Sequence, residues 1–211
     1  MHQCARFSAQ PKQAHARALK WLGRYLYGTK TEGIIYRPKA EDLHCYVDAD
    51  FAGAWHPDDA QDPVTAKSRT GFYLGYAGCP IYWTSRLQTL VALSTTEAEY
   101  VALSTALREA IPLMGVINEI AERGMMAPPT TAKVHCTVFE DNSGAVELVR
   151  SPKMRPRTKH INIRYHHFRE HVRAGQITVQ KVSTDDQTAD VLTKQLPVEV
   201  FRKHRRAICG W

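Results

Sequence analysis

A strand that ends in two carboxylates constrains this chain more than any other feature of its sequence. From Leu43 to Asp50, apolar and polar residues alternate with the period of two that is typical of a β-strand. Asp48 and Asp50 come where this strand should end, and a glycine, Gly53, then permits a turn. Ligands of α/β folds bind outside the carboxyl ends of the strands. The stretch therefore predicts a polar site at the rim of a sheet.

Three later acidic residues lie at the edges of other predicted elements. Glu99 lies in a predicted long helix, Asp141 follows a predicted strand, and Asp190 lies in a predicted final helix. Hard divalent cations such as Mg²⁺ take carboxylate oxygens as ligands and keep waters for a substrate phosphate. A pair of such ions can clamp the attacking and leaving oxygens of a phosphoryl displacement. If the four segments converge, the chain has the ligands that this chemistry requires.

The composition is that of an ordinary globular protein. The 211 residues can hold one sizeable core, and 44% of them are hydrophobic and 23% charged. No apolar run approaches the roughly 18 residues of a membrane span, and the N-terminus has no signal-peptide pattern, so no membrane partner is expected. The five cysteines are scattered without a Cys-x-x-Cys pair, which favours free thiols in a reducing compartment over disulfides or zinc.

The net charge of +7 is unevenly placed. Between Arg150 and Arg173 there are eight Lys or Arg residues against a single acid, Glu170. In a chain with clustered acids elsewhere, such a strip suggests a polyanion held against bound metal ions. A solvated helix face would carry the same charges, and this alternative stays open.

The hydrophobic periodicity predicts a mixed sheet with helices packed on it. The first core strands are consecutive, which implies an antiparallel meander. Ser94 and Glu97 form a capping box at the start of the long helix, and Pro112 should kink or divide that helix. Helices are predicted over residues 14–27, 94–123, 143–149, 161–172 and 189–196, and strands over residues 33–36, 43–50, 71–76, 81–85, 134–139 and 177–182.

Five motifs, in this order, resemble the ribonuclease H domain of copia-type retrotransposon polyproteins. They are Tyr46–Gly53 (YVDADFAG), Leu93–Tyr100 (LSTTEAEY), Asp141–Ala145 (DNSGA), Thr158–Ile161 (TKHI) and Gln187–Lys194 (QTADVLTK). A further stretch, Arg24–Lys30 (RYLYGTK), resembles the segment that joins reverse transcriptase to that domain. The resemblance covers nearly the whole chain.

This resemblance implies a fold, a domain organisation and a reaction. The expected fold is α/β and ribonuclease H-like, with a five-stranded mixed sheet whose first three strands are antiparallel. Residues 1–42 would be the end of the reverse transcriptase region, residues 43–196 the ribonuclease H domain and residues 197–211 a basic tail. The expected reaction is metal-dependent hydrolysis of the RNA strand of RNA–DNA hybrids, which leaves a 5′-phosphate and a 3′-hydroxyl. The expected partners are the hybrid and the reverse transcriptase domain of the same polyprotein, in a cytoplasmic virus-like particle with access to the nucleus.

The resemblance also implies a set of metal ligands. Asp48, Glu99, Asp141 and Asp190 would be the catalytic residues and would hold two Mg²⁺ ions, for which Mn²⁺ could substitute. Asp48 would bridge both ions, and Asp190 would help to hold the ion that activates water. Glu99 and Asp141 would hold the ion at the leaving oxygen.

Neighbouring acids compete for two of these assignments. Asp48 is favoured over Asp50 because it comes first after the core residues of the strand. Glu97 is explained by the capping box, and Glu99 lies roughly 200° further around the helix. The family pattern of Ala-Glu followed by Tyr or Leu also places the ligand at Glu99.

The other two assignments have acidic neighbours as well. Only Asp141 matches the Asp-Asn-Ser turn of the family, whereas Glu140 precedes it. Asp185 and Asp186 come before the last helix, where an N-cap and a first-turn charge suit the helix dipole.

Contacts with the hybrid are expected from the third and fourth motifs and from the basic strip. The residues are Asn142, Ser143, Lys153, Arg155, Arg157, Lys159 and His160. Cellular relatives carry a histidine before the last helix that is thought to help product release, but the corresponding loop, Ser183–Gln187, has none. Either turnover does without this histidine, or His160 substitutes for it.

Other interpretations remain open for some residues and for the whole chain. His167 and His171 have the spacing of a zinc pair on a helix, but no Cys or acid completes the set. Tyr82 and Trp83 could stack on bases, although such residues in a strand are more often core. The second functional hypothesis is a catalytically inactive element remnant that binds hybrid or packs on reverse transcriptase. The third is another nuclease or a transposase of the same fold.

Overall fold

The computed structural model describes the whole chain except residues 1, 6, 40–42, 60, 126–132 and 152–165. The chain forms two compact units. The smaller contains residues 1–34 together with Trp211, and the larger contains Ile35–Gly210.

The smaller unit is built on one amphipathic helix. It comprises α1 (His2–Ala5) and α2 (Gln13–Gly28), and the ring of Phe7 stacks on that of His15 with centroids 4.0 Å apart. The predicted amphipathic helix is confirmed, but none of its residues is buried. The large apolar side chains of α2 that are exposed are Leu19, Trp21, Tyr25, Leu26 and Tyr27.

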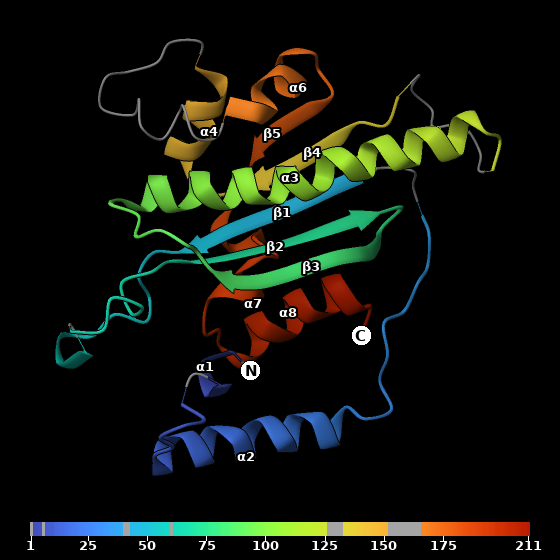
Figure 1. The fold of residues 1–211 in the computed structure, drawn as a ribbon. Helices are drawn as coiled ribbons and strands as arrows, with labels where there is room; N and C mark the ends of the chain where they lie inside the picture. The colour runs from blue at the N-terminus through green and yellow to red at the C-terminus, as the bar shows by residue number, and fades with distance from the viewer. Residues whose placement is uncertain (1, 6, 40–42, 60, 126–132, 152–165) are drawn as a thin grey trace. The chain divides into compact units, whose positions relative to one another are not determined.

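The larger unit contains the predicted sheet. Its strands are β1 (Leu43–Asp50), β2 (Arg69–Tyr76), β3 (Cys79–Leu87), β4 (Cys136–Glu140) and β5 (Ile177–Lys181), in the order β3-β2-β1-β4-β5. β1, β2 and β3 pair antiparallel, and β4 and β5 continue the sheet in parallel with β1 (Figure 1). The predicted fold class, a ribonuclease H-like five-stranded mixed sheet, is therefore confirmed.

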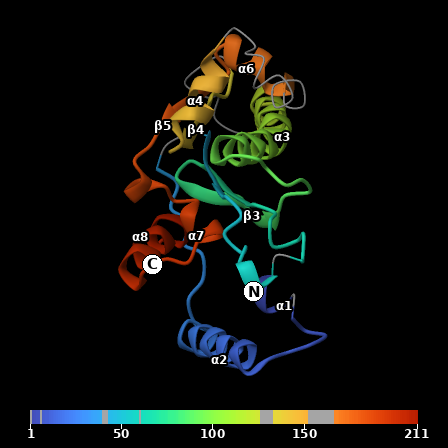
Figure 2. The ribbon, with the colours of Figure 1, turned by 90° about the vertical axis from the view of Figure 1, so that its left-hand side faces the viewer.

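Helices cover both faces of this sheet (Figure 2). On one face lie α3 (Thr95–Glu122), α4 (Ser143–Arg150) and α6 (Arg169–Arg173), and on the other lie α7 (Asp190–Thr193) and α8 (Val198–Cys209). Short 3₁₀ turns are η1 (Pro57–Asp59), η3 (His166–Phe168) and η4 (Thr184–Asp186). Helix α8 occupies most of the predicted basic tail and packs against β3 and α7.

The long helix α3 forms the centre of the core. Its buried stripe packs on β1 and β2, and the alternation in β1 buries Leu43, Cys45 and Val47. Pro112 does not divide the helix, contrary to one predicted outcome. Buried Ala110 and Met114 flank the proline, so packing on the sheet offsets the lost hydrogen bond.

By length and composition α3 could also cross a membrane, which the hydropathy of the sequence did not lead us to expect. More than half of its most apolar window is buried inside the fold, as in the core helix of a globular unit.

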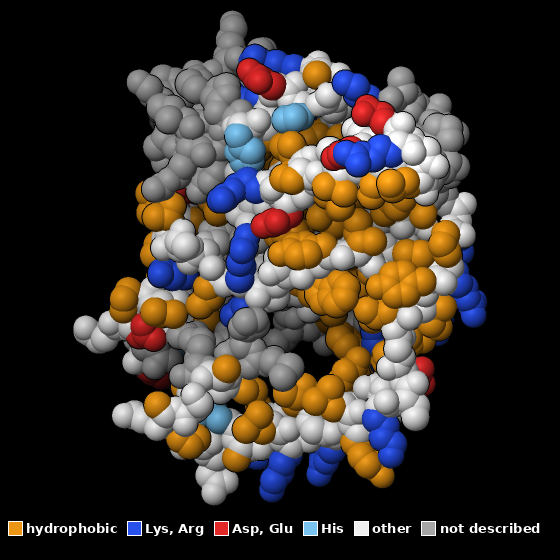
Figure 3. All heavy atoms as spheres, turned by 45° about the vertical axis from the view of Figure 1, so that its right-hand side comes forward, with side chains coloured by type: hydrophobic (Ala, Val, Ile, Leu, Met, Phe, Trp, Pro, Cys, Tyr) orange, Lys and Arg blue, Asp and Glu red, His pale blue; other side chains and the backbone are white. Residues whose placement is uncertain are grey.

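Two smaller predictions were wrong. Residues 33–36 form no strand, because the amide of Ile35 donates to the carbonyl oxygen of Cys209 at the end of α8 and not to a neighbouring strand. Tyr82 and Trp83 are not core residues. β3 is an edge strand, and their exposed fractions are 39% and 46%. Figure 3 shows such exposed hydrophobic side chains on one face of the molecule.

Candidate active site

Three of the four predicted acids converge at one end of the sheet. Asp48 lies near the carboxyl end of β1, and Asp141 follows β4, which runs parallel to β1 at its side. Glu99 lies in the second turn of α3, which crosses this region of the sheet (Figure 1). One carboxylate oxygen from each of the three lies within 4.8 Å of the others. Parallel neighbours end at the same edge of a sheet, and this topology brings together residues far apart in sequence.

The fourth acid, Asp190, joins this cluster through a lysine. Lys194, one turn further along, places Nζ 2.9 Å from Oδ1 of Asp190 and 2.9 Å from Oδ1 of Asp48. The hydroxyl of Thr193 donates a hydrogen bond to Oδ2 of Asp48. Both oxygens of Asp48 are therefore held by the segment that carries Asp190.

For two of the acids, a buried glutamine side chain holds the backbone of the preceding residue. Buried Gln187 donates from Nε2 to the carbonyl oxygen of Val47, the residue before Asp48, at 2.9 Å. Buried Gln88 donates in the same way to the carbonyl oxygen of Ala98, the residue before Glu99, at 2.8 Å. Neither role was predicted, because hydrogen bonds from a side chain to the backbone of another element leave no periodic signal in the sequence.

A fifth carboxyl group, that of Glu140, lies in the same region. It is fully buried at the end of β4, and its Oε1 accepts the amide of Asn142 at 3.0 Å. Its Oε2 has no hydrogen-bond partner among the described residues. Burial first, and then the negative charges of Asp141 and Asp48, raise the pKa of Glu140 well above its usual value. The Asp-Asn-Ser pattern indicates Asp141 alone, so this buried neighbour was not predicted.

The electrostatics of the cluster favour a bound cation. Burial and the nearby carboxylates of Glu140 and Asp48 raise the pKa of Glu99 to about 11, and burial with Asp48 raises the pKa of Asp190 to about 6. Oε2 of Glu99 is buried without a hydrogen-bond partner in the described part of the chain. A divalent cation would offset this repulsion and satisfy the free oxygen, so the residues fit a hard metal ion.

Apart from Glu140, the acids that competed for these assignments are not part of the cluster. Asp50 is half-buried beyond Asp48 and is not part of the cluster of ligand atoms. The capping box is confirmed, since Ser94 Oγ accepts the amide of Glu97 and Glu97 Oε2 accepts the amide of Leu93. Asp186 does not cap α7. It accepts hydrogen bonds from Ser183 Oγ and Lys203 Nζ within and beside η4.

The predicted substrate contacts are only partly described. Asn142 caps α4, with its Oδ1 accepting the amide of Ala145, and Ser143 Oγ accepts from Lys181 Nζ. The remaining predicted residues lie outside the described part of the chain, namely Lys153, Arg155, Arg157, Lys159 and His160. His171 Nδ1 lies 2.7 Å from Oε1 of Gln176, and no candidate metal group among the described residues includes it.

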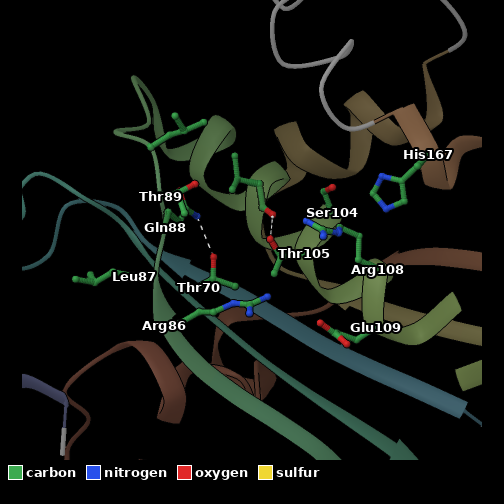
Figure 4. A pocket seen from close by; sticks show the side chains of 12 residues that line it. Thr70, Arg86, Leu87, Gln88, Thr89, Ser104, Thr105, Arg108, Glu109 and His167 are labelled. Carbon is green, nitrogen blue, oxygen red and sulfur yellow. Dashed lines mark hydrogen bonds between the residues drawn. The ribbon is translucent and has the colours of Figure 1, made fainter. Parts of the chain in front are cut away.

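A cavity of about 690 Å³ lies between β3, the start of the following loop and α3. Arg86 reaches it from β3, Arg108 from α3 and His167 from η3 (Figure 4). In its wall Gln88 donates to the hydroxyl of Thr70 at 3.1 Å. Two arginines therefore line the same cavity as Gln88, the glutamine that positions Glu99.

The fold and comparison with known proteins show the class and family of the chain. Its topology defines a ribonuclease H-like α/β domain with an acidic cluster at one end of the sheet. The chain belongs to the family of retrovirus-related Pol polyproteins of copia-type transposons. It is 36% identical over 197 residues to the polyprotein of transposon TNT 1-94 from Nicotiana tabacum, which covers 93% of the chain. It is 37% identical over 204 residues to that of transposon RE1 from Arabidopsis thaliana, which covers 96%.

The chain spans only 14% and 13% of the lengths of these two relatives. No family model matches it. Among solved structures, it is similar to LC11-RNase H1 from compost, with a TM-score of 0.47 and 15% identity over 77% of this chain and 97% of that one. Another structure of LC11-RNase H1, in complex with an RNA/DNA hybrid, also gives a TM-score of 0.47 at 15% identity, over 72% and 94%.

Proposed function

We propose that the chain is a metal-dependent endoribonuclease that hydrolyses the RNA strand of RNA–DNA hybrids during reverse transcription of a copia-type element. The observation that carries this proposal is the convergence of Asp48, Glu99 and Asp141, with one oxygen of each within 4.8 Å. Lys194 contacts both Asp48 and Asp190, which links the fourth acid to this group. Carboxylates that come together from distant segments support the binding of Mg²⁺ at a phosphoryl-transfer site.

The proposed ligands divide between two metal ions. Asp48, Glu99 and Asp141 would hold Mg²⁺ together, and Asp48 with Asp190, which share the contact with Lys194, would hold a second ion. Bound ions would activate a water molecule and stabilise the charge that develops on the phosphate. Gln187 and Gln88 hold the backbone beside Asp48 and Glu99, which keeps the carboxylates in place.

Cationic groups on the same molecule support a nucleic-acid substrate. The net charge is +7, and the strip from Arg150 to Arg173 supplies much of it. Among the described residues, Arg86 and Arg108 line the cavity beside α3. We propose that these groups contact backbone phosphates of the hybrid, because such contacts fix a duplex without reading its sequence.

The relatives suggest a place in a larger polyprotein. Residues 1–42 would be the end of a reverse transcriptase region, residues 43–196 the ribonuclease H domain and residues 197–211 its C-terminal extension. The partner of this domain would then be the reverse transcriptase region of the same polyprotein. An inactive remnant is not favoured, because all four acids are retained.

The test is cleavage of a labelled RNA–DNA hybrid with Mg²⁺, with Mn²⁺ and with EDTA. We expect cleavage with either metal and none with EDTA, and products that carry 5′-phosphates. Asp48→Asn should lower the rate by at least about 10³-fold, since a neutral amide cannot replace a carboxylate between two cations. Asp50→Asn is the matched control and should retain most of the activity. A protein that cuts hybrid in EDTA, or an Asp48→Asn variant near the wild-type rate, would contradict the proposal.

A further inference from the structure

Lys194 occupies an unusual place for a lysine. Its ammonium group lies 2.9 Å from a carboxylate oxygen of each of two acids, Asp48 and Asp190, inside the acidic cluster. Asp48 is fully buried and Asp190 nearly so, whereas the side chain of Lys194 keeps an exposed fraction of 34%. Lys194 therefore forms ion pairs with two buried carboxylates at once.

The acidic groups around Lys194 repel one another, and a positive charge among them reduces this repulsion. Glu99 and Asp141 contribute two more acidic groups around Asp48, from α3 and from the end of β4. Like charges at such distances repel one another, and burial strengthens the repulsion. Among the described residues, Lys194 is the only cation that forms an ion pair with an acid of the cluster.

We propose that Lys194 is an internal counter-ion that holds Asp48 and Asp190 in place before metal binds and gives up these carboxylates when metal arrives. This inference rests on the proposed function, since it concerns the same metal site. Oδ1 of Asp48 and Oδ1 of Asp190 are the oxygens that Lys194 contacts, and a divalent cation bound between these acids would repel the ammonium group. Because the side chain of Lys194 is partly exposed, its ammonium group can move into solvent when a cation binds.

If Lys194 and the metal ion compete for the same carboxylates, the direction of the change in metal affinity on removing Lys194 can be predicted. Lys194 lowers the free energy of the metal-free protein and must be displaced when a cation binds, so it weakens metal affinity. Removing the charge should therefore destabilise the metal-free protein and tighten Mg²⁺ binding. A lysine that remained in place as a fixed partner of the metal-bound site would give no such gain in affinity.

The experiment uses the full chain with Lys194→Gln and Lys194→Arg. Mg²⁺ binding is measured by calorimetric titration without nucleic acid, and the melting temperature is measured in EDTA and in saturating Mg²⁺. We expect Lys194→Gln to melt lower in EDTA, to gain more in melting temperature from Mg²⁺ than wild type, and to bind Mg²⁺ about fivefold or more tightly. Lys194→Arg keeps the charge and should bind Mg²⁺ no more tightly than wild type.

Lys203 supplies a matched control. Its Nζ also contacts two acceptors, Oδ1 of Asp186 at 2.7 Å and the carbonyl oxygen of Asp185 at 2.6 Å, but away from the acidic cluster. Lys203→Gln should leave Mg²⁺ affinity unchanged. An equal gain in affinity in both glutamine variants would reduce the effect to net charge and overturn the inference.

The remaining outcomes separate this inference from the proposed function. If Lys194→Gln binds Mg²⁺ as wild type does or more weakly while wild type cleaves hybrid, only the counter-ion role is wrong. If wild type neither binds Mg²⁺ nor gains stability from it, the metal site and the inference both fail. If Lys194→Gln is unfolded in EDTA and folds on addition of Mg²⁺, the inference is supported. If it does not fold in either condition, tighter Mg²⁺ binding by Lys194→Arg than by wild type would overturn it.

Discussion

Single residues beside the acids decide where the carboxylates lie. Gln187 is fully buried, and its side chain bridges two elements by donating to Val47 on β1 and accepting the amide of Ala189 before α7. Gln88 similarly bridges β2 and α3 through Thr70 and Ala98. A buried carbonyl group left without its donor costs free energy, so these amides stabilise the fold and fix the site together.

Replacing Gln187 should show this double role. Gln187→Met keeps the length of the side chain but leaves the carbonyl group of Val47 unpaired, which should cost about 1–3 kcal/mol in the free energy of unfolding. It should also lower the rate of hybrid cleavage, because Asp48 follows Val47 directly. Chemical denaturation and the cleavage assay measure the two effects. The control is Gln180→Met, at an exposed position on β5, which should change neither by much.

The convergence of Asp48, Glu99 and Asp141 could be predicted from sequence, but the residues around them could not. Asp48 and Asp141 stand at strand ends and Glu99 follows a capping box, so local patterns indicate their places. Lys194 is the last residue of the final motif, and nothing in its spacing indicates an ion pair with Asp48, 146 residues away in the chain. Contacts of this kind depend on how elements pack, and periodicity in one element does not carry that information.

At the scale of elements, the approach of α7 to the sheet brings Asp190 and Lys194 to Asp48. Gly71 on β2 lies directly opposite Asp48 in the antiparallel pair. A Cβ atom at this position would lie 2.6 Å from Cγ2 of Thr193 and 2.8 Å from Cβ of Leu192. The absence of a side chain at residue 71 therefore lets α7 lie close enough for Thr193 to reach Asp48.

Gly71→Ala should separate these elements. We expect a loss of about 1–3 kcal/mol in the free energy of unfolding, because α7 must shift to relieve the overlap. Mg²⁺ affinity should fall as well, since Asp190 moves with α7. Gly115→Ala is the control, because a Cβ atom there meets nothing within 4 Å inside α3, and it should stabilise the protein by about 0.5–1 kcal/mol. Equal stability of the two variants would contradict the close-packing argument.

The basic strip, whose residues 152–165 lie outside the described part of the chain, also has a predicted role. Changing Lys153, Arg155, Arg157 and Lys159 to Ala should weaken hybrid binding and flatten the plot of log affinity against log salt concentration. The slope should fall by about 0.9 for each phosphate group that the variant no longer neutralises. The same titration with Arg86→Ala and Arg108→Ala measures the contribution of the cavity. An unchanged slope in the fourfold variant would mean that the strip does not bind the hybrid.

The whole chain divides into two units of very different character. The larger unit, Ile35–Gly210, has a continuous core, whereas α2 in the smaller unit has no buried residue. Both the sheet and the amphipathic helix could be predicted from sequence because each has a clear period. The catalytic domain was predicted to begin at residue 43, whereas the larger unit begins at Ile35. No sequence pattern indicates that the amide of Ile35 donates a hydrogen bond to Cys209 at the end of α8. That hydrogen bond joins the segment before β1 to the larger unit.

A shortened chain of residues 35–211 should therefore fold and cleave hybrid. It retains the sheet, the acids and the bond between Ile35 and Cys209, and it lacks a helix that is marginal in water by itself. We expect a melting temperature within a few degrees of the full chain and a similar Mg²⁺ requirement. Hybrid affinity should fall modestly, because Lys20, Arg24 and Lys30 are removed. Thermal melting and cleavage assays on both chains measure these effects, and failure of the shortened chain to fold would show that residues 1–34 complete the core.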